Sequence, residues 1–242
     1  MKKIILIIFL ITFVLSGYTQ KIPDFYGFMS VYKTSIFKDM DGDITFIPIP
    51  PGVGRIMTML ARPVQINISE SKNILIRTHL EYYRAPYEPG DFPLSVGMEK
   101  RSGSLLTGIS LKLKKNPIKL NIATDVLSKS DGTKIELFYD HSLVRTRKKS
   151  STLQLGFKYY DKDLSDYYFG VTANEATINR NLYIADSSII PSISYNVRQM
   201  LTPKRTLMYG VETNFYDNEI KDSPLVDESY SLRFVFGILW NK

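Results

Sequence analysis

The sequence has no cysteine at any of its 242 positions. A chain without cysteine can form no disulfide framework, offers no thiolate for catalysis, and cannot be anchored as a lipoprotein through an N-terminal cysteine. Beyond the first twenty residues the sequence also lacks any run of eighteen apolar residues, which is the signature of a transmembrane helix. The rigidity of the folded chain therefore has to come from features other than crosslinks or helical membrane anchors.

The N-terminus has the three parts of a secretory signal peptide. Two lysines precede an apolar run over residues 4–15, and small and polar residues follow at 16–19. This run is too short for a membrane-spanning helix, which needs about twenty apolar residues. We therefore expect a cleaved signal peptide over residues 1–19 and one mature domain over residues 20–242.

The charge is biased toward basic residues, with a formal net charge of +7 and a sequence pI near 9.3. A basic chain can bind nucleic acid, but an exported chain does not meet nucleic acid in its compartment. We expect no nucleic-acid partner, and an anionic lipid or polymer surface is the more natural one.

Most of the mature chain alternates between apolar and polar residues with a period of two, which is typical of β-strands. In "TLQLGFKYY" the apolar residues Leu153, Leu155 and Phe157 share one face, while Gln154 and Lys158 share the other. The pattern predicts ten strands, at residues 25–38, 53–68, 73–85, 104–115, 117–128, 133–146, 151–160, 188–199, 204–217 and 229–240. Many are longer than the five or six residues usual in soluble proteins, and membrane-crossing strands need about nine to eleven.

The connections between these segments alternate in length. The short ones contain "SESK", "KNP", "KKS" and "QMLTPK"; the long ones contain "DMDGDITFIPIPPG", "APYEPGDFPLSVGMEKRSG", the stretch from Asp161 and "NEIKDSPLVDES", with "SKSDGT" as a brief exception. Alternation of this kind is typical of outer-membrane barrels, which have short periplasmic turns and long outer loops. The sequence predicts an all-β, antiparallel, up-and-down transmembrane barrel of about ten strands. A count of twelve stays open, because residues 168–172 could form a further strand and the loops one more.

Charged side chains recur on the polar face of several predicted strands. A Lys or Arg facing lipid at the membrane midplane costs about 2–4 kcal/mol, so we assign this face to the barrel interior. Mixed charges inside a narrow barrel are expected to pair across it. The candidate interior residues are Arg77, His79, Glu81, Asp125, Glu136, Asp140, Lys158, Glu212 and Arg233.

Catalytic and metal-binding patterns are weak. His141 is followed by Ser142, but neighbouring residues of a strand point to opposite faces, so this pair cannot form a nucleophile and its base. "DMDGD" at residues 39–43 carries three carboxylates, yet it does not fit the EF-hand loop, and a weak calcium site there stays an alternative to a polar loop. We predict no catalytic residue, no cofactor and no assigned metal ligand, and therefore no enzyme.

One short turn is strongly basic. Arg145, Arg147, Lys148 and Lys149 lie together between two predicted strands, on the side expected to face the periplasm. A solvated turn is the default interpretation of such a cluster. The sharper hypothesis is that the turn contacts an acidic partner in the periplasm.

The stretch "DYYFGVTANEA" at residues 166–176 carries the most specific pattern. A tyrosine-rich element containing Tyr167, Tyr168 and Gly170 is followed by Glu175, and "DSPLVDESYSLRFVFGILW" closes the chain. Together these elements, with the predicted hairpin "DVLSKSDGTKIELFY", resemble the MipA/OmpV family, named for the MltA-interacting protein. The resemblance covers the mature chain and implies a barrel in the outer membrane of a Gram-negative bacterium, with Tyr167 to Ala176 ordered in an outer loop.

The resemblance also implies a function. The type member of the family is similar to a scaffold that joins a lytic transglycosylase to a penicillin-binding protein. Other members of the family look like adhesins, osmotic-response proteins or antibiotic-associated proteins. We therefore expect a non-enzymatic barrel that docks murein-remodelling enzymes. The alternative is a narrow channel for small solutes, and a third hypothesis is a membrane lipid hydrolase or acyltransferase, for which the sequence offers no same-face Ser and His pair. Outer-membrane lipid is the expected surrounding partner.

Overall fold

The structure is a computed structural model that describes residues 25–51 and 64–241. The predicted signal peptide, residues 1–19, lies outside the described residues. The first part of the predicted strand at residues 53–68 also lies outside them.

Eleven strands of the described residues form one antiparallel sheet. Nine of the ten predicted segments correspond to strands at nearly the predicted positions, and the tenth is represented by its described part, β3. The strands are β1 (Phe25–Lys33), β2 (Asp43–Ile49), β3 (Val64–Glu70), β4 (Ile74–Tyr83), β5 (Ser104–Leu113), β6 (Ile118–Asp125), β7 (Thr133–Arg145), β8 (Lys149–Tyr160), β9 (Ser188–Thr202), β10 (Arg205–Phe215) and β11 (Tyr230–Asn241).

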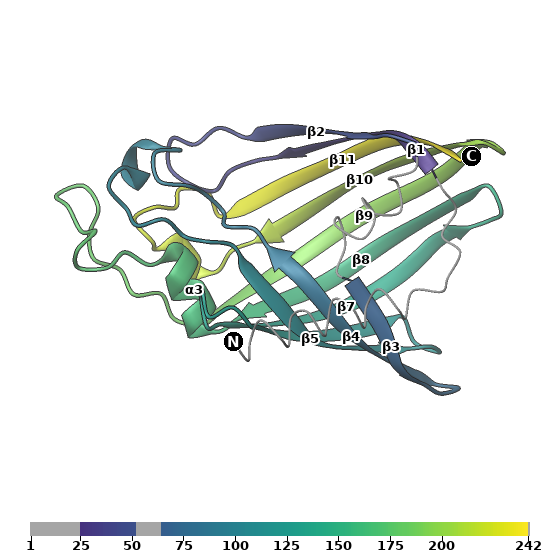
Figure 1. The fold of residues 1–242 in the computed structure, drawn as a ribbon, viewed down its shortest axis with the longest axis horizontal. Coiled ribbons are helices and arrows are strands. Elements are labelled where there is room, and N and C mark those ends of the chain that lie inside the picture. Colours follow the sequence, from purple (N-terminus) through teal and green to yellow (C-terminus); the bar gives the residue numbers. More distant parts are fainter. Residues whose placement is uncertain (1–24, 52–63, 242) are drawn as a thin grey trace.

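The sheet has the up-and-down topology of a barrel. Its order is β2-β1-β11-β10-β9-β8-β7-β6-β5-β4-β3, so nearly every strand lies beside its neighbour in sequence. The first strand also pairs with the last, from Phe25 opposite Asn241 to Lys33 opposite Arg233. The sheet curls around an interior (Figure 1). Within the described residues it keeps two free edges, β2 and β3.

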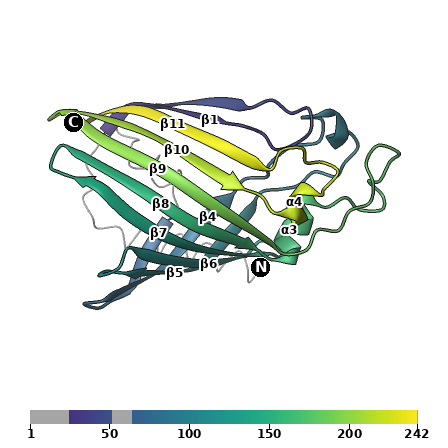
Figure 2. The ribbon, with the colours of Figure 1, turned by 180° about the vertical axis from the view of Figure 1, so that it is seen from behind.

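The two ends of the curled sheet differ. At the end where Asn241 lies, short turns join β3 to β4, β5 to β6, β7 to β8 and β9 to β10. The opposite end carries longer loops with a 3-10 helix (Pro93–Ser95), α3 (Lys162–Phe169) and α4 (Asn218–Lys221), which gather there in both views of the ribbon (Figures 1 and 2). This confirms the predicted alternation of short and long connections.

The prediction that residues 39–52 form one outer loop is wrong, because β2 lies within them. The first predicted strand ends at Lys33 rather than at residue 38, and the chain turns back so that Asp43 pairs with Lys33. Pro48 and the flanking prolines concealed this strand. Proline lacks the N–H of a sheet ladder, but it is tolerated on an edge strand, and β2 pairs with β1 alone among the described strands.

The strand considered at residues 168–172 is also wrong. Tyr168 belongs to α3, whose start is fixed by Asp161: its side chain accepts a hydrogen bond of 2.9 Å from the backbone N–H of Leu164. An N-cap aspartate satisfies a backbone donor that the first helical turn leaves free. The aromatic residues that suggested a strand are instead buried on one side of this helix.

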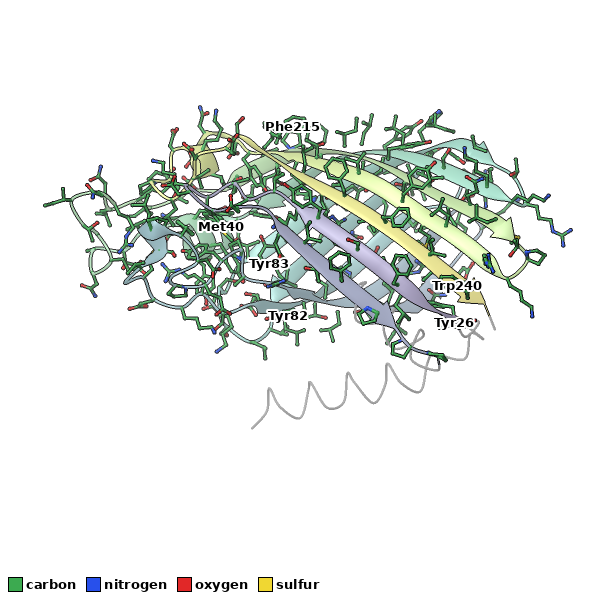
Figure 3. All side chains as sticks on the ribbon, turned by 90° about the horizontal axis from the view of Figure 1, so that it is seen from above. Tyr26, Met40, Tyr82, Tyr83, Phe215 and Trp240 are labelled. Carbon is green, nitrogen blue, oxygen red and sulfur yellow. The ribbon has the colours of Figure 1, made fainter. Side chains whose placement is uncertain are left out.

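The outward face of the sheet is apolar, and aromatic side chains on it pair between the neighbouring strands β1 and β11. Tyr26 stacks on Trp240 with ring centroids 5.9 Å apart, near the end where the chain terminates (Figure 3). Side chains that lie on this face with more than a third of their surface exposed include Phe28, Ile109, Leu137, Phe157, Ile193 and Phe236. Within the described residues, no helix is long and apolar enough to cross a membrane.

Gly108 is required by the close approach of β5 to β6. A Cβ atom at this position would lie 1.7 Å from the carbonyl oxygen of Ile122, which belongs to the neighbouring backbone. At Gly237 the nearest atom, at 2.9 Å, is instead in the flexible side chain of Met29. We expect Gly108→Ala to lower the free energy of unfolding by about 1–3 kcal/mol more than Gly237→Ala, because the nearest backbone atom at Gly237, the carbonyl oxygen of Phe28, is 3.1 Å away and needs only a small shift.

Denaturant unfolding of the two variants in the same detergent measures this difference. Equal midpoints for the two alanine variants would contradict the close approach of β5 and β6.

Candidate functional site

Two groups of charged side chains lie inside the curled sheet, and both contain predicted interior residues. In the first, Lys134 of β7 forms ion pairs with Glu81 of β4 and with Glu136, the latter at 3.2 Å. Glu136 also accepts a hydrogen bond of 3.1 Å from Asn121. The Lys134 side chain is only 8% exposed, so its charge is neutralised by two carboxylates rather than by bulk water.

The second group is centred on Glu212 of β10. One of its carboxylate oxygens accepts a hydrogen bond of 2.7 Å from Lys158 of β8, and the other accepts from Arg233 of β11. Lys158 also donates to Asn214, again at 2.7 Å. Each group contains an ion pair between strands that are not adjacent in the sheet: β4 with β7 in the first group and β8 with β10 in the second.

Three further predicted residues lie on the inner face, and two of them have polar partners. Arg77 donates hydrogen bonds of 2.9 Å to Asn67 and to Gln65 on the neighbouring strand. Asp140 accepts one of 2.6 Å from Gln154. His79 is buried, and its Nδ1 atom has no hydrogen-bond partner among the described residues.

Asp125 has a different role from the one predicted for it. It stands at the end of β6 and accepts hydrogen bonds from the backbone N–H groups of Leu127, Lys129 and Ser130, at 2.7–2.9 Å. These bonds close the loop between β6 and β7. A carboxylate surrounded by backbone donors fixes a turn and does not take part in the interior ion pairs.

The predicted outer-loop residues Tyr167 and Tyr168 lie on α3 and fasten it to the start of β5. The Tyr167 hydroxyl accepts a hydrogen bond of 2.8 Å from the backbone N–H of Ser102, and the Tyr168 hydroxyl donates to the Ser102 carbonyl at 3.1 Å. Burial raises the pKa of Tyr168 to about 12, so its hydroxyl stays protonated at neutral pH. Gly170 ends the helix where a Cβ atom would lie 2.3 Å from Asp166.

Glu175 is the polar centre of this loop region. It is 2% exposed and forms an ion pair of 2.8 Å with Arg101, which belongs to a different loop. The same carboxylate accepts 2.9 Å hydrogen bonds from the backbone N–H groups of Glu99 and Thr172. Burial alone would raise the pKa of Glu175, but these donors, Arg101 foremost, lower it to about 2.

Arg180 fastens the two loops from the other side. It is 3% exposed, and its guanidinium donates to the carbonyl oxygens of Glu175, Leu94 and Val96. Arg101, Glu175 and Arg180 thus join residues 94–101 to residues 172–180. We call these three residues the loop clasp.

An apolar cluster beneath the clasp fills this end of the sheet. It is built from loop residues and from inward-facing residues at the strand ends, with Tyr168 packed 5.0 Å from Tyr83 between ring centroids. Figure 3 shows Met40 and Tyr83 near this end, far from Trp240. The buried members are Ile36, Phe37, Tyr87, Phe92, Met98, Tyr160, Leu164, Tyr168, Phe169, Val171, Ile190, Ile220, Leu225 and Val226.

The basic turn lies at the opposite end. Arg145, Arg147 and Lys148 are exposed and Lys149 is half-buried, and none of the four forms an ion pair within the described residues. The turn itself is held by a 2.8 Å hydrogen bond from the N–H of Thr146 to the carbonyl of Lys149. The four positive charges are therefore available to solvent or to a partner.

The acidic stretch at residues 39–43 is placed beside a groove of about 550 Å³ that Asp39, Asp41, Asp227 and Glu228 help to line. Across residues 25–51 and 64–241, no group of three or more side chains of the metal-ligating types is arranged to hold a metal ion. The calcium alternative gains no support from this geometry.

Comparison with known proteins places the chain in a family. The model described as MltA-interacting protein MipA matches residues 27–241. The chain belongs to the MipA family. Putative outer membrane protein YiaT of Escherichia coli K12 is 30% identical to this MipA-family chain over 146 residues, which cover 59% of each protein. OmpV of Vibrio cholerae is 24% identical over 135 residues, covering 55% of this chain and 52% of OmpV.

The matches span a little more than half the length of these curated relatives. Among solved structures, Neisserial surface protein A is similar over 90% of this chain and 96% of that chain, with 10% identity and a TM-score of 0.23, so nothing is drawn from that likeness. The sheet topology and the named relatives show that this MipA-family protein is an outer-membrane β-barrel protein.

Sequence reasoning missed three residues that organise these sites. Lys134 could have been found, because it shares the inner face with Glu136 two positions later. Arg101 and Arg180 lie in loops, where no periodicity assigns a face to a side chain. Their partner Glu175 lies 74 residues from Arg101 in sequence, so only the tertiary structure pairs them.

Removing the charge of Glu175 should loosen the clasp. In Glu175→Gln the buried Arg101 guanidinium loses its carboxylate, and breaking a buried ion pair on one side costs about 3–5 kcal/mol. We expect faster trypsin cleavage after Arg101 and Arg180 in the folded protein. The control is Glu88→Gln, whose pair with Lys100 is exposed (63% and 66%) and contributes little. Equal protection in both variants would contradict the role of the clasp.

The clasp should also open at low pH. Since the folded-state pKa of Glu175 is about 2 and its ordinary value is 4.5, the stabilisation is complete above about pH 4.5 and is lost as the pH falls toward 2. A spin label at Ile178→Cys, a site 98% exposed in a chain without cysteine, should gain mobility over that interval. In a Glu175→Gln background the same label should already be mobile at neutral pH. Its mobility should then not change as the pH falls from 4.5 toward 2.

Proposed function

We propose that this barrel is a non-enzymatic docking protein for murein-remodelling enzymes of the periplasm. The description of its family, MltA-interacting protein, names an interaction with MltA, a lytic transglycosylase. A lytic transglycosylase is accordingly the first partner we propose, and a penicillin-binding protein the second.

The observation that carries the proposal is the basic turn at Arg145, Arg147, Lys148 and Lys149. It lies at the end of the sheet with the short turns, which faces the periplasm in outer-membrane barrels. Four neighbouring cations without carboxylate partners in the described part of the chain form a surface that attracts an acidic protein face. Such charges steer association and set partner choice more than they add to affinity.

The positions of the two histidines support a non-enzymatic role. His141 is exposed on the outward face, where its ring stacks on Tyr139 at 6.4 Å between centroids. His79 lies on the inner face. Within the described residues the Nδ1 atom of His79 has no hydrogen-bond partner, so it is not paired with a serine nucleophile there.

The alternative, a narrow channel for small solutes, is less well supported. Its best argument is the charged inner face, but Glu81, Glu136 and Glu212 of that face are paired with the cations Lys134, Lys158 and Arg233. The apolar cluster and the loop clasp fill the outer end. A transport function would require both to move.

The test is recovery of partners by in-cell crosslinking and mild-detergent purification of the tagged barrel. Replacing Arg145, Arg147, Lys148 and Lys149 with serine should lower recovery of a lytic transglycosylase by about tenfold, because a few rim charges together supply roughly 1.4 kcal/mol. The matched control replaces four basic residues of the outer loops, Lys38, Lys100, Lys129 and Lys162.

Two results would oppose the proposal in different ways. Undiminished recovery with the turn variant would show that the enzyme docks elsewhere. Absence of any murein enzyme from the native sample would count against docking itself.

A further inference from the structure

The two ends of the barrel carry opposite charge. The four short turns with their flanking strand residues, at 70–74, 113–117, 145–149 and 202–205, contain nine basic residues and one acidic residue, Glu70. We call the nine the basic rim: Lys72, Lys114, Lys115, Arg145, Arg147, Lys148, Lys149, Lys204 and Arg205. The five connections at the other end, at 34–42, 84–103, 126–132, 161–187 and 216–229, contain sixteen acidic and eight basic residues.

The rim charges are largely unpaired. Lys114 forms an ion pair of 2.6 Å with Glu70. Within the described part of the chain, the other eight rim residues form no ion pair. The rim residues are exposed, except for the half-buried Lys149. Like charges gathered on adjacent turns repel one another, and a bound anion would relieve this repulsion.

The rim begins where the apolar outer face ends. Ile74, Leu143 and Leu201, each 40–50% exposed, are the last outward apolar residues before three of the four turns. The stacked Tyr26 and Trp240 mark the same end of the sheet (Figure 3). Aromatic residues of this kind occupy the membrane–water interface in barrels. The rim cations therefore lie at the level of the lipid headgroups of the periplasmic leaflet.

We propose that the basic rim binds the phosphate headgroups of acidic phospholipids in the periplasmic leaflet of the outer membrane. Outside the docking turn the composition of the rim favours lipid over a protein face: four of the five residues there are lysine, which protein interfaces avoid at their centres. Its distribution over four separate turns suits several small, mobile anions around the barrel. Lysine and arginine at such positions extend their charged ends into the headgroup layer while their stems stay against apolar surface.

This lipid site does not depend on enzyme docking. Five rim residues lie outside the turn assigned to docking, and a test can be confined to them. The rim variant replaces Lys72, Lys114, Lys115, Lys204 and Arg205 with glutamine and leaves Arg145 to Lys149 intact. The control variant makes the same charge change at the opposite end, at Lys38, Lys100, Lys129, Lys162 and Lys221.

The experiment compares spin-labelled phosphatidylglycerol with spin-labelled phosphatidylcholine as lipids in contact with the full mature barrel in phosphatidylcholine vesicles. We expect the native barrel to prefer the labelled phosphatidylglycerol by on the order of threefold at low salt. The preference should fall toward unity at about 1 M salt, where the screening length is about 3 Å. This salt response tests the native chain without any substitution.

The rim variant should lose at least half of the preference, while the control variant keeps it. Equal contact of the native barrel with both lipids would overturn the proposal. An equal loss in the rim and control variants would also overturn it, because the preference would then follow net charge rather than the rim. Enzyme recovery from cells carrying the rim variant tests docking separately, since the docking turn is unchanged.

Discussion

Every backbone N–H and C=O group that a chain places in lipid has to be paired within the protein, and this requirement organises the whole molecule. Within the described residues the sheet pairs β1 with β2 and the consecutive strands from β3 to β11, and it brings β1 back against β11, so that only β2 and β3 are edges. Because successive side chains of a strand point to opposite faces, the period of two places apolar residues on the outer face and polar residues on the inner face. Apolar residues such as Phe157 and Phe236 lie outside, and Lys158 and Arg233 lie inside.

A charged interior creates a second requirement, which is met by pairing across strands. Lys134 and Glu81 come from β7 and β4, which do not adjoin in the sheet, and Glu212 is shared by Lys158 and Arg233. Such pairs offset the desolvation of their charges more than they stabilise the fold. What they provide is an interior in which Glu81, Glu136 and Glu212 are paired with cations from other strands or from their own.

The two ends of the barrel differ in how their connections pack. At the outer end, the loop clasp and the apolar cluster make an ordered cover in which the Glu175 carboxylate is held by Arg101 and by backbone N–H groups. At the other end the connections are too short to build a core, so their side chains face the surroundings. This division is the basis of the two proposals, enzyme docking and lipid binding at the end with the short turns.

The sequence by itself determined most of the strands, their faces and the alternation of short and long connections. The reason is that a period of two, and the end of a strand at proline or glycine, are local properties of the sequence. It failed where a local pattern has two solutions. Asp43–Ile49 became an edge strand despite Pro48, and the aromatic stretch at Tyr168 became a helix once Asp161 capped it. Only the tertiary structure decided that Glu175 meets Arg101, that Lys134 joins the interior and that Asp125 closes a turn. Those pairings depend on which distant segments lie close together in the folded protein, and residue spacing along the chain does not show this.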